Sequence, residues 1–208
     1  MGYRKKIIYS WDLEDGRAVA LEFEPVGQEV RVRDGQQDQL LVGYLLPDEY
    51  LDEFGWGDDE GLGEFKEFRS AADLAAYMEA VEDEGKVALL VDKYEHGLCH
   101  YSIANTAPYP DRRWDVAPCA VLVPCDWLQE EYRAGKKTWA ELVQDSNVTL
   151  DSYSNWCNGE CYRYVIQHHD RETLELLDTD SVCGFIGYQH ALEELEHQLQ
   201  CYAGCGEE

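Results

Sequence analysis

The first 46 residues carry the hydrophobic pattern of short β-strands. Four short runs rich in Val, Ile, Leu and Tyr occupy residues 6–11, 18–23, 28–33 and 40–46. Turn signals such as Asp34-Gly35 separate these runs. In the third run, Val30 and Val32 alternate with charged residues, which indicates a strand with one exposed face. The pattern predicts an antiparallel meander.

The rest of the chain alternates between helical and strand patterns. Capping signals and helical periodicity predict helices over 70–84, 126–132, 138–157 and 189–201, the third interrupted at 145–149, and one or two helical turns over 48–54. Apolar runs predict strands over 87–94, 98–104, 117–124, 160–167, 173–177 and 182–188, the first two joined at His96-Gly97. We expect an α+β fold: a mostly antiparallel sheet with three or four helices packed on it. The expected division is a meander plus acidic helix over 1–86 and an α+β region over 87–208, or one continuous domain.

The composition fits a folded chain rather than a disordered acidic one. The 208 residues include 14 Tyr and 6 Trp, and 45% of all residues are hydrophobic, which suffices for a core. The start of the chain lacks the apolar run of a signal peptide, and no stretch approaches a membrane span. We therefore expect a cytoplasmic protein with no membrane contact, whose eight Cys are reduced thiols.

Negative charge is concentrated in two segments. The net charge is −26; residues 47–84 hold fourteen Asp and Glu against two Lys and Arg, and residues 170–208 hold ten against one. Such a concentration of charge is informative about binding partners or solubility and not about a catalysed reaction. The basic clusters are too small to track phosphates, which disfavours direct binding of nucleic acid. The acids expected to contact a partner are Asp48, Glu49, Asp52, Glu53, Asp58, Asp59, Glu60, Glu64 and Glu67.

The cysteines and histidines offer weak candidates for chemistry. Two Cys-x3-Cys pairs, Cys157 with Cys161 and Cys201 with Cys205, have a spacing that a structural zinc site accepts, although small buried thiols are the favoured interpretation. The neighbours Cys99 and His100 cannot form a nucleophile–base pair, because adjacent side chains of a strand point to opposite faces. The sequence contains no catalytic motif, and we expect no cofactor.

Short aromatic and glycine signatures follow one another between residues 87 and 200. In order they are Tyr94-Glu95-His96-Gly97, Tyr101-Ser102, Trp114-Asp115, Ala120-Val121-Leu122-Val123, Tyr153, Asn158-Gly159-Glu160-Cys161-Tyr162 and Asp180-Ser181-Val182-Cys183-Gly184-Phe185-Ile186-Gly187. This order resembles an uncharacterised family of small acidic proteins encoded by bacteriophages and integrative mobile elements. The family has no assigned activity. The resemblance implies a genetic context, the accessory genes of mobile elements, in which anti-defence proteins are common.

A second candidate site lies in the middle of this region. The loop over 105–115 is long for a connection between strands. It carries two adjacent arginines, which are the main positive charges in the nearly neutral middle of the chain. We expect it to approach the 94–97 turn, where Trp114 closing one end of the core is the favoured interpretation and a ligand site is the alternative. The residues of this candidate site are Tyr94, His96, Arg112, Arg113, Trp114 and Asp115.

The acidic segments favour one function over two alternatives. The leading hypothesis is a non-enzymatic DNA mimic of the antirestriction or anti-CRISPR type, which occupies a basic groove of a nucleic-acid-binding host protein. The first alternative is a Cys/His enzyme or zinc-binding protein of a mobile element. The second is an acidic accessory protein that binds a small molecule or protein without mimicry. Mimicry predicts that salt weakens binding, because salt screens the attraction to a basic partner. Salt should also stabilise the fold, because it screens the repulsion among the acids of the chain.

Overall fold

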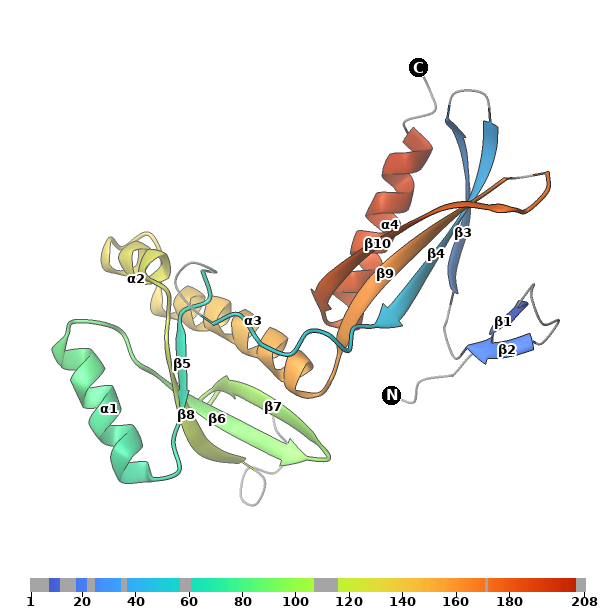
Figure 1. The fold of residues 1–208 in the computed structure, drawn as a ribbon. Helices are drawn as coiled ribbons and strands as arrows, with labels where there is room; N and C mark the ends of the chain where they lie inside the picture. The colour runs from blue at the N-terminus through green and yellow to red at the C-terminus, as the bar shows by residue number, and fades with distance from the viewer. Residues whose placement is uncertain are drawn as a thin grey trace. The chain divides into compact units, whose positions relative to one another are not determined.

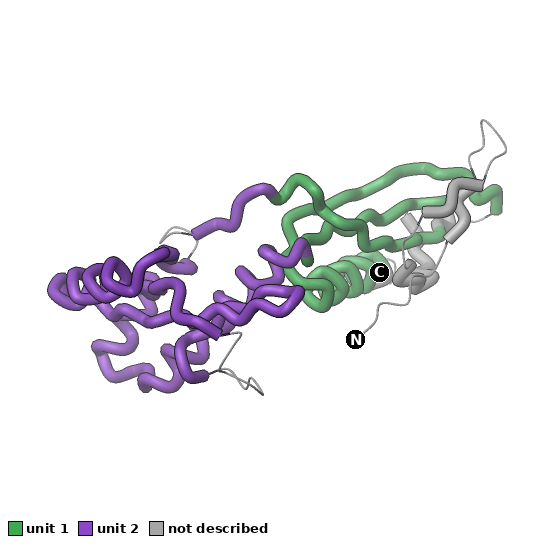
Figure 2. The backbone as a smooth tube through the Cα atoms, turned by 90° about the horizontal axis from the view of Figure 1, so that it is seen from below, with its two compact units in different colours: residues 1–51, 160–208 green, residues 52–159 purple. Residues whose placement is uncertain are grey.

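The computed structural model describes residues 8–11, 18–21, 25–34, 37–56, 61–106, 116–170 and 172–204. The chain forms two compact units, shown in Figure 2: unit 1 comprises residues 1–51 and 160–208, and unit 2 comprises residues 52–159. This division does not follow the expected boundary at residue 86. The reason is long-range pairing, because β4 (Gln37–Pro47) runs antiparallel to β9 (Cys161–Asp170) and thereby joins both ends of the chain.

Unit 1 contains an antiparallel sheet with the strand order β10-β9-β4-β3, and Figure 1 shows it beside a single helix. β3 spans Pro25–Asp34 and β10 spans Leu176–Ile186. Among the described strands, β1 (Ile8–Trp11) and β2 (Ala18–Leu21) pair only with each other. The four N-terminal strands are thus confirmed, but they do not form one meander. The two strands expected at 173–177 and 182–188 are one strand, β10, with two register irregularities.

Helix α4 (Tyr188–Gly204) covers one face of this sheet. Its apolar side chains Ala191, Leu195 and Leu199 are fully buried against the strands. Gly43 of β4 permits the close approach, since a Cβ atom there would lie 2.9 Å from Leu195 Cδ1 and 3.0 Å from Leu199 Cδ1. The helix expected at 189–201 is therefore confirmed as the element that closes the core of unit 1.

Unit 2 contains a second antiparallel sheet, with the strand order β5-β8-β6-β7. Its strands are β5 (Glu64–Glu67), β6 (Leu89–His96), β7 (Leu98–Ile103) and β8 (Val116–Val123). Gly97 joins β6 to β7 with a φ of 84°, a left-handed conformation that favours glycine. The expected hairpin at this position is confirmed, and the overall α+β class is as predicted.

Unit 2 has three helices: α1 and α3 pack on its sheet, and α2 packs on α3. α1 (Ala71–Asp83) begins at Ser70, whose hydroxyl accepts hydrogen bonds from the backbone N–H groups of Ala72 and Asp73. α2 spans Asp126–Arg133 and α3 spans Trp139–Cys157. Thr138 and Glu141 form a reciprocal capping box at the start of α3. The helices expected at 70–84 and 126–132 are confirmed.

Two helix predictions were wrong. Residues 48–54 are not helical. The expected interruption of α3 at 145–149 is absent, because the polar residues there serve the fold: Ser146 donates to the carbonyl of Leu142, and Asn147 Oδ1 accepts from the N–H of Ile103. Asn158 and Ser154 accept from the N–H groups of Cys99 and Tyr101 in the same way. Side chains of α3 and its C-cap thus satisfy alternate donors along the edge strand β7, which explains why the segment is polar and yet helical.

Candidate functional site

The structure sorts the acids predicted to contact a partner into three groups. Those exposed are Glu49, Asp52, Glu53, Glu64 and Glu67. Asp58, Asp59 and Glu60 lie outside the described residues. Asp48 is a correction: its side chain is buried, with 8% exposure, and its carboxylate accepts hydrogen bonds from the N–H groups of Tyr50 and Gly184. Asp48 therefore stabilises unit 1 and is not available to a partner.

The acids of β5 are held in place by tyrosines. The hydroxyl of Tyr77 donates to Glu64 Oε1 at 2.5 Å, and that of Tyr101 donates to Glu67 Oε1 at 2.8 Å. Burial, with a further contribution from the Glu64 hydrogen bond, raises the pKa of Tyr77 to about 12. Burial also raises the pKa of Tyr101, again reinforced by its carboxylate partner. Both hydroxyls stay protonated at neutral pH, so each one remains a donor that orients an exposed carboxylate.

Helix α1 adds a second set of carboxylates to the same unit. Its exposed acids are Asp73, Glu79, Glu82 and Asp83, followed by the C-cap Glu84. None of these five forms an ion pair with any lysine, arginine or histidine in the described part of the chain. The last turn carries no basic residue, although the negative end of the helix dipole disfavours acids there. The acids of this turn therefore lower the stability of the helix, and the sequence keeps them nonetheless.

Several bases of unit 2 are engaged elsewhere. Lys66 Nζ lies over the ring of Tyr77, at 4.5 Å from the centroid. Three other lysines pair with carboxylates outside α1; these pairs are Lys93 with Glu95, Lys136 with Glu131, and Lys137 with Asp145. Arg133 donates to the carbonyl of Gly85. Unit 2 has 22 Asp and Glu against 9 Lys and Arg, a net charge of −13, so its acids outnumber its bases.

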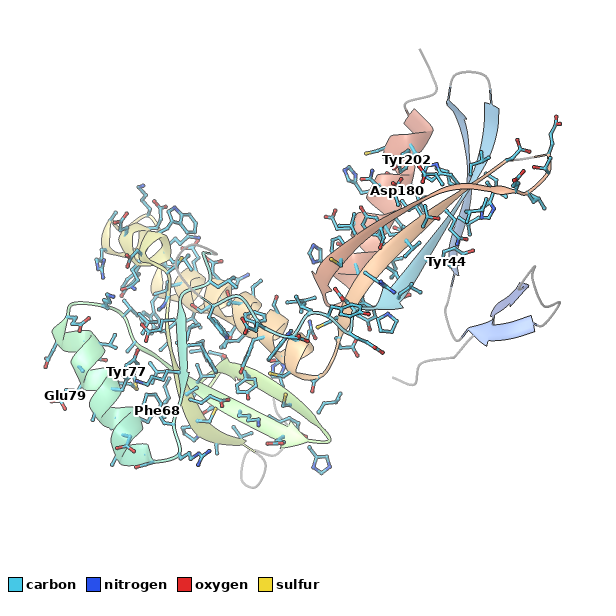
Figure 3. All side chains as sticks on the ribbon, viewed as in Figure 1. Tyr44, Phe68, Tyr77, Glu79, Asp180 and Tyr202 are labelled. Carbon is cyan, nitrogen blue, oxygen red and sulfur yellow. The ribbon has the colours of Figure 1, made fainter. Side chains whose placement is uncertain are left out.

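We name the exposed acids of α1, its C-cap Glu84 and Glu64 of β5, which Tyr77 of α1 binds, the acidic face of unit 2. Figure 3 shows Tyr77 and Phe68 on the side of α1 that faces the strands, whereas Glu79 points away from them. The two rings contact each other at 5.2 Å, and Leu74 and Val81 bury the same side of the helix. The apolar side of α1 is thereby fixed, which leaves its acids exposed.

An aromatic cluster fixes the segment that follows Asp52. Trp56 stacks on Phe65 of β5 with centroids 4.8 Å apart, and Phe54 meets Tyr153 of α3 edge-on at 5.2 Å. These contacts give residues 52–56 a defined position without a helix. The sequence interpretation missed this cluster; its only signal is the aromatic pair Phe54 and Trp56 within an acidic stretch.

The described cysteines among the proposed zinc ligands, Cys157, Cys161 and Cys201, are not gathered into a metal site. Within the ranges that the structure describes, no group of three or more His, Cys, Asp or Glu could hold a metal ion. Cys161 is buried on β9, and Cys201 Sγ lies 3.7 Å from His197 Nε2 on α4. Cys157 ends α3 beside Cys99 and Tyr153. Cys205 lies outside the described residues.

Two cysteines of unit 2 are poorly suited to nucleophilic chemistry at neutral pH. Burial raises the pKa of Cys119 to about 12 and that of Cys157 to about 11. The thiolate is the reactive form, and both groups are almost fully protonated at pH 7. His100 Nε2 lies 3.8 Å from Asp151 Oδ1. At these positions the geometry gives no support to the Cys/His enzyme hypothesis.

The second candidate site is only partly described. Tyr94 and His96 lie at the end of β6, with ring centroids 6.5 Å apart. Arg112, Arg113, Trp114 and Asp115 lie outside the described residues. Their approach to the 94–97 turn therefore stays a prediction.

Comparisons with known proteins add no relative. No family model matches the chain, and neither a curated protein nor a solved structure matches it. The resemblance to proteins of mobile elements therefore stays a prediction. In the described ranges, the chain has no helix that is both long and apolar enough to cross a membrane.

Proposed function

We propose that the protein is a non-enzymatic acidic binding protein of the anti-defence type, which uses the acidic face of unit 2 to occupy a basic, nucleic-acid-binding groove of a host protein. The observation that carries the proposal is the set of exposed carboxylates on α1 that have no ion pair with a described residue. The host protein would supply the missing cations. Buried apolar residues of α1 hold the helix to the sheet, so the acids are presented on a folded scaffold.

The spacing of these charges supports mimicry of a duplex. The four acids between residues 79 and 84 span about 7.5 Å along a helix axis, at about 1.5 Å per residue. Duplex DNA carries about one charge per 1.7 Å of axis, or about four over the same length. The linear charge density of this turn thus matches that of the nucleic acid it would replace.

Two variants with the same change in charge test the role of the face. The first replaces Glu79, Glu82 and Glu84 with Gln, and the matched control replaces Glu193, Glu194 and Glu196 of α4 with Gln. Each chain is immobilised, partners are captured from a host lysate at low salt, and mass spectrometry identifies them. We expect wild type and the α4 variant to capture the same basic DNA-binding protein, and the α1 variant to bind it at least tenfold more weakly, because three partner cations lose their counter-charge.

A competition experiment separates mimicry from ordinary acidic binding. Duplex DNA should displace the captured protein, and the complex should not bind DNA. Raising the salt from about 0.1 M to 1 M shortens the Debye length from about 10 Å to about 3 Å, so affinity should fall while the melting temperature rises. A captured partner that binds DNA and this protein at the same time would refute mimicry and favour an acidic accessory protein. Capture of no nucleic-acid-binding protein would refute the proposal altogether.

A further inference from the structure

Two thiols of unit 2 meet where α3 ends. Cys99 lies near the start of β7, and Cys157 is the last residue of α3, 58 positions later in the sequence. The thiol of Cys99 is close enough to that of Cys157 to influence its pKa. Cys99 Sγ also lies 3.5 Å from Asn158 Oδ1, next in sequence to Cys157. The pair was not predicted, because nothing in the local sequence connects Cys99 with Cys157.

The backbone around the pair is fixed by an amide side chain. Asn158 Nδ2 donates to the carbonyl of Cys99 at 2.7 Å, and the N–H of Cys99 donates to Asn158 Oδ1 at 2.9 Å. Both polar backbone groups of Cys99 are therefore bound to the residue that follows Cys157. Ser154 extends this attachment by one helical turn through its bond to Tyr101. The hydrogen bonds that join β7 to α3 therefore place Cys99 beside the end of α3, where Cys157 lies.

We propose that Cys99 and Cys157 form a thiol-oxidation site, at which a small disulfide such as glutathione disulfide is reduced and an intramolecular disulfide is formed. Cys157 is exposed and Cys99 is half-buried, so Cys157 is the thiol that the oxidant reaches first. This assignment is independent of the proposed binding function.

The reaction proceeds through two exchanges. The Cys157 thiol loses its proton, and its sulfur attacks one sulfur of glutathione disulfide; a mixed disulfide forms and one glutathione thiolate leaves. Cys99 Sγ, after losing its proton, attacks the sulfur of Cys157 and releases the second glutathione. Two protein thiols are oxidised by two electrons, the small disulfide is reduced to two thiols, and the protons pass to solvent or to glutathione. Excess reduced glutathione reverses both steps.

The protonation of Cys157 controls the rate of the first exchange. The groups that influence the pKa of its thiol are Tyr153 on α3, Cys99 on β7 and Glu67 on β5. Burial is the main cause of its raised pKa, while the hydrogen bond from Tyr153 opposes the shift. Since the reactive thiolate is scarce at neutral pH, the rate should rise about tenfold per pH unit between pH 7 and pH 9.

Peptide mapping of the oxidised full-length chain tests the proposal. The protein is incubated with glutathione disulfide at pH 8, free thiols are alkylated, and the digest is analysed without reduction. We expect a Cys99–Cys157 cross-linked peptide and an intact mass lower by two hydrogens per chain. Cys99→Ser should retain glutathione on Cys157, because the resolving thiol is missing. Cys183→Ser, which removes an exposed thiol of unit 1, should form the cross-link as wild type does.

The wild-type map alone can overturn the proposal. If Cys157 keeps glutathione while Cys99 remains alkylated, the two thiols do not react with each other and the inference fails. It also fails if Cys157 is cross-linked equally to several other cysteines, since the contact would then confer no selectivity. Circular dichroism of each variant confirms that a lost cross-link does not reflect lost folding.

Discussion

The two units have the same net charge, but three acids of unit 1 are bound within the described part of the fold, whereas the acids of α1 in unit 2 are not. Unit 1 holds 21 Asp and Glu against 8 Lys and Arg, so its charge of −13 equals that of unit 2. In unit 1, Asp48 binds two backbone N–H groups, Asp170 binds those of Glu172 and Thr173, and Asp180 accepts from Tyr202. The acids of α1 in unit 2 have no such partners among the described residues. Net charge alone does not identify a binding surface; the hydrogen bonds and ion pairs of each carboxylate do.

The helices that cover the two sheets differ in the same sense. α4 contacts all four strands of its sheet and buries Ala191, Leu195 and Leu199 completely. α1 packs mainly on β8, and its buried residues Leu74 and Val81 keep 9% and 7% exposure. α4 is therefore a core element, whereas α1 is a peripheral helix, and the stability of the fold places fewer constraints on the sequence of α1. A peripheral helix is the better place for a surface shaped by a partner.

Truncating one leucine in each helix tests this difference. Leu195→Ala should lower the free energy of unfolding of unit 1 by about 2–5 kcal/mol, because it leaves a cavity in a packed core. Leu74→Ala should cost unit 2 less, since α1 can adjust at the edge of its core. Urea denaturation followed by tryptophan fluorescence and circular dichroism measures both losses. Equal losses would contradict the distinction between a core helix and a peripheral one.

Filling the contact between α4 and β4 should have a somewhat smaller effect. Gly43→Ala places a methyl group within 3.0 Å of two fully buried leucine side chains, which must both shift. We expect a loss of about 1–3 kcal/mol, the usual cost of overpacking a core. Gly85→Ala is the control in unit 2, where a Cβ atom would meet nothing within 4 Å and only the left-handed φ of 76° opposes it. A Gly43→Ala protein as stable as wild type would show that α4 moves freely on its sheet.

Local signals in the sequence located most of the elements correctly. Ser70 as N-cap and Gly85 as the stop defined α1, and Thr138 defined the start of α3, because a cap depends only on residues within one turn. The four N-terminal strands were found for the same reason, since alternation and turn residues are local. The acidic segment at 64–67 and the capped helix were recognised as charged surfaces.

Long-range contacts account for what the sequence did not show. The pairing of β4 with β9 decides the two units, and no local pattern encodes it. Asp48 was taken for a surface acid because its partner, the N–H of Gly184, is 136 positions away. The break expected in α3 was inferred from its polar residues. These residues bind the N–H groups of β7, a contact that no local pattern in the sequence indicates.

Neutralising the last turn of α1 should stabilise unit 2 while it weakens binding. In the variant with Glu79, Glu82 and Glu84 replaced by Gln, the acids at the C-terminal end no longer oppose the helix dipole, which is worth about 0.3–1 kcal/mol per charge at low salt. The matched α4 variant should change stability less, because Glu193, Glu194 and Glu196 lie away from the last turn. Thermal melts at low and high salt measure the gain. If the α1 variant is less stable than wild type, its acids serve the fold and not a partner.

Asp180 provides the mildest test, through the dependence of stability on pH. Figure 3 shows Asp180 and Tyr202 close together, and the Tyr202 hydroxyl donates to Asp180 Oδ2 at 2.5 Å. This bond, aided by His168, holds the pKa of the Asp180 carboxyl below its ordinary value of about 3.9. A lowered pKa in the folded state means that the contribution to stability is complete above pH 4 and is lost as the pH falls through the folded pKa.

Asp180→Asn should therefore slightly lower the free energy of unfolding of unit 1 at neutral pH. The variant should also lose less stability than wild type when the pH is lowered. Tyr202→Phe should do the same, because it deletes the largest cause of the shift while keeping the carboxylate. Urea denaturation at pH 3, 4, 5 and 7 measures the stability difference between each variant and wild type. That difference should be largest at pH 7 and shrink toward pH 3. If the stability difference between variant and wild type stays constant with pH, the contact between Tyr202 and Asp180 contributes packing only. The charge of Asp180 would then not stabilise unit 1.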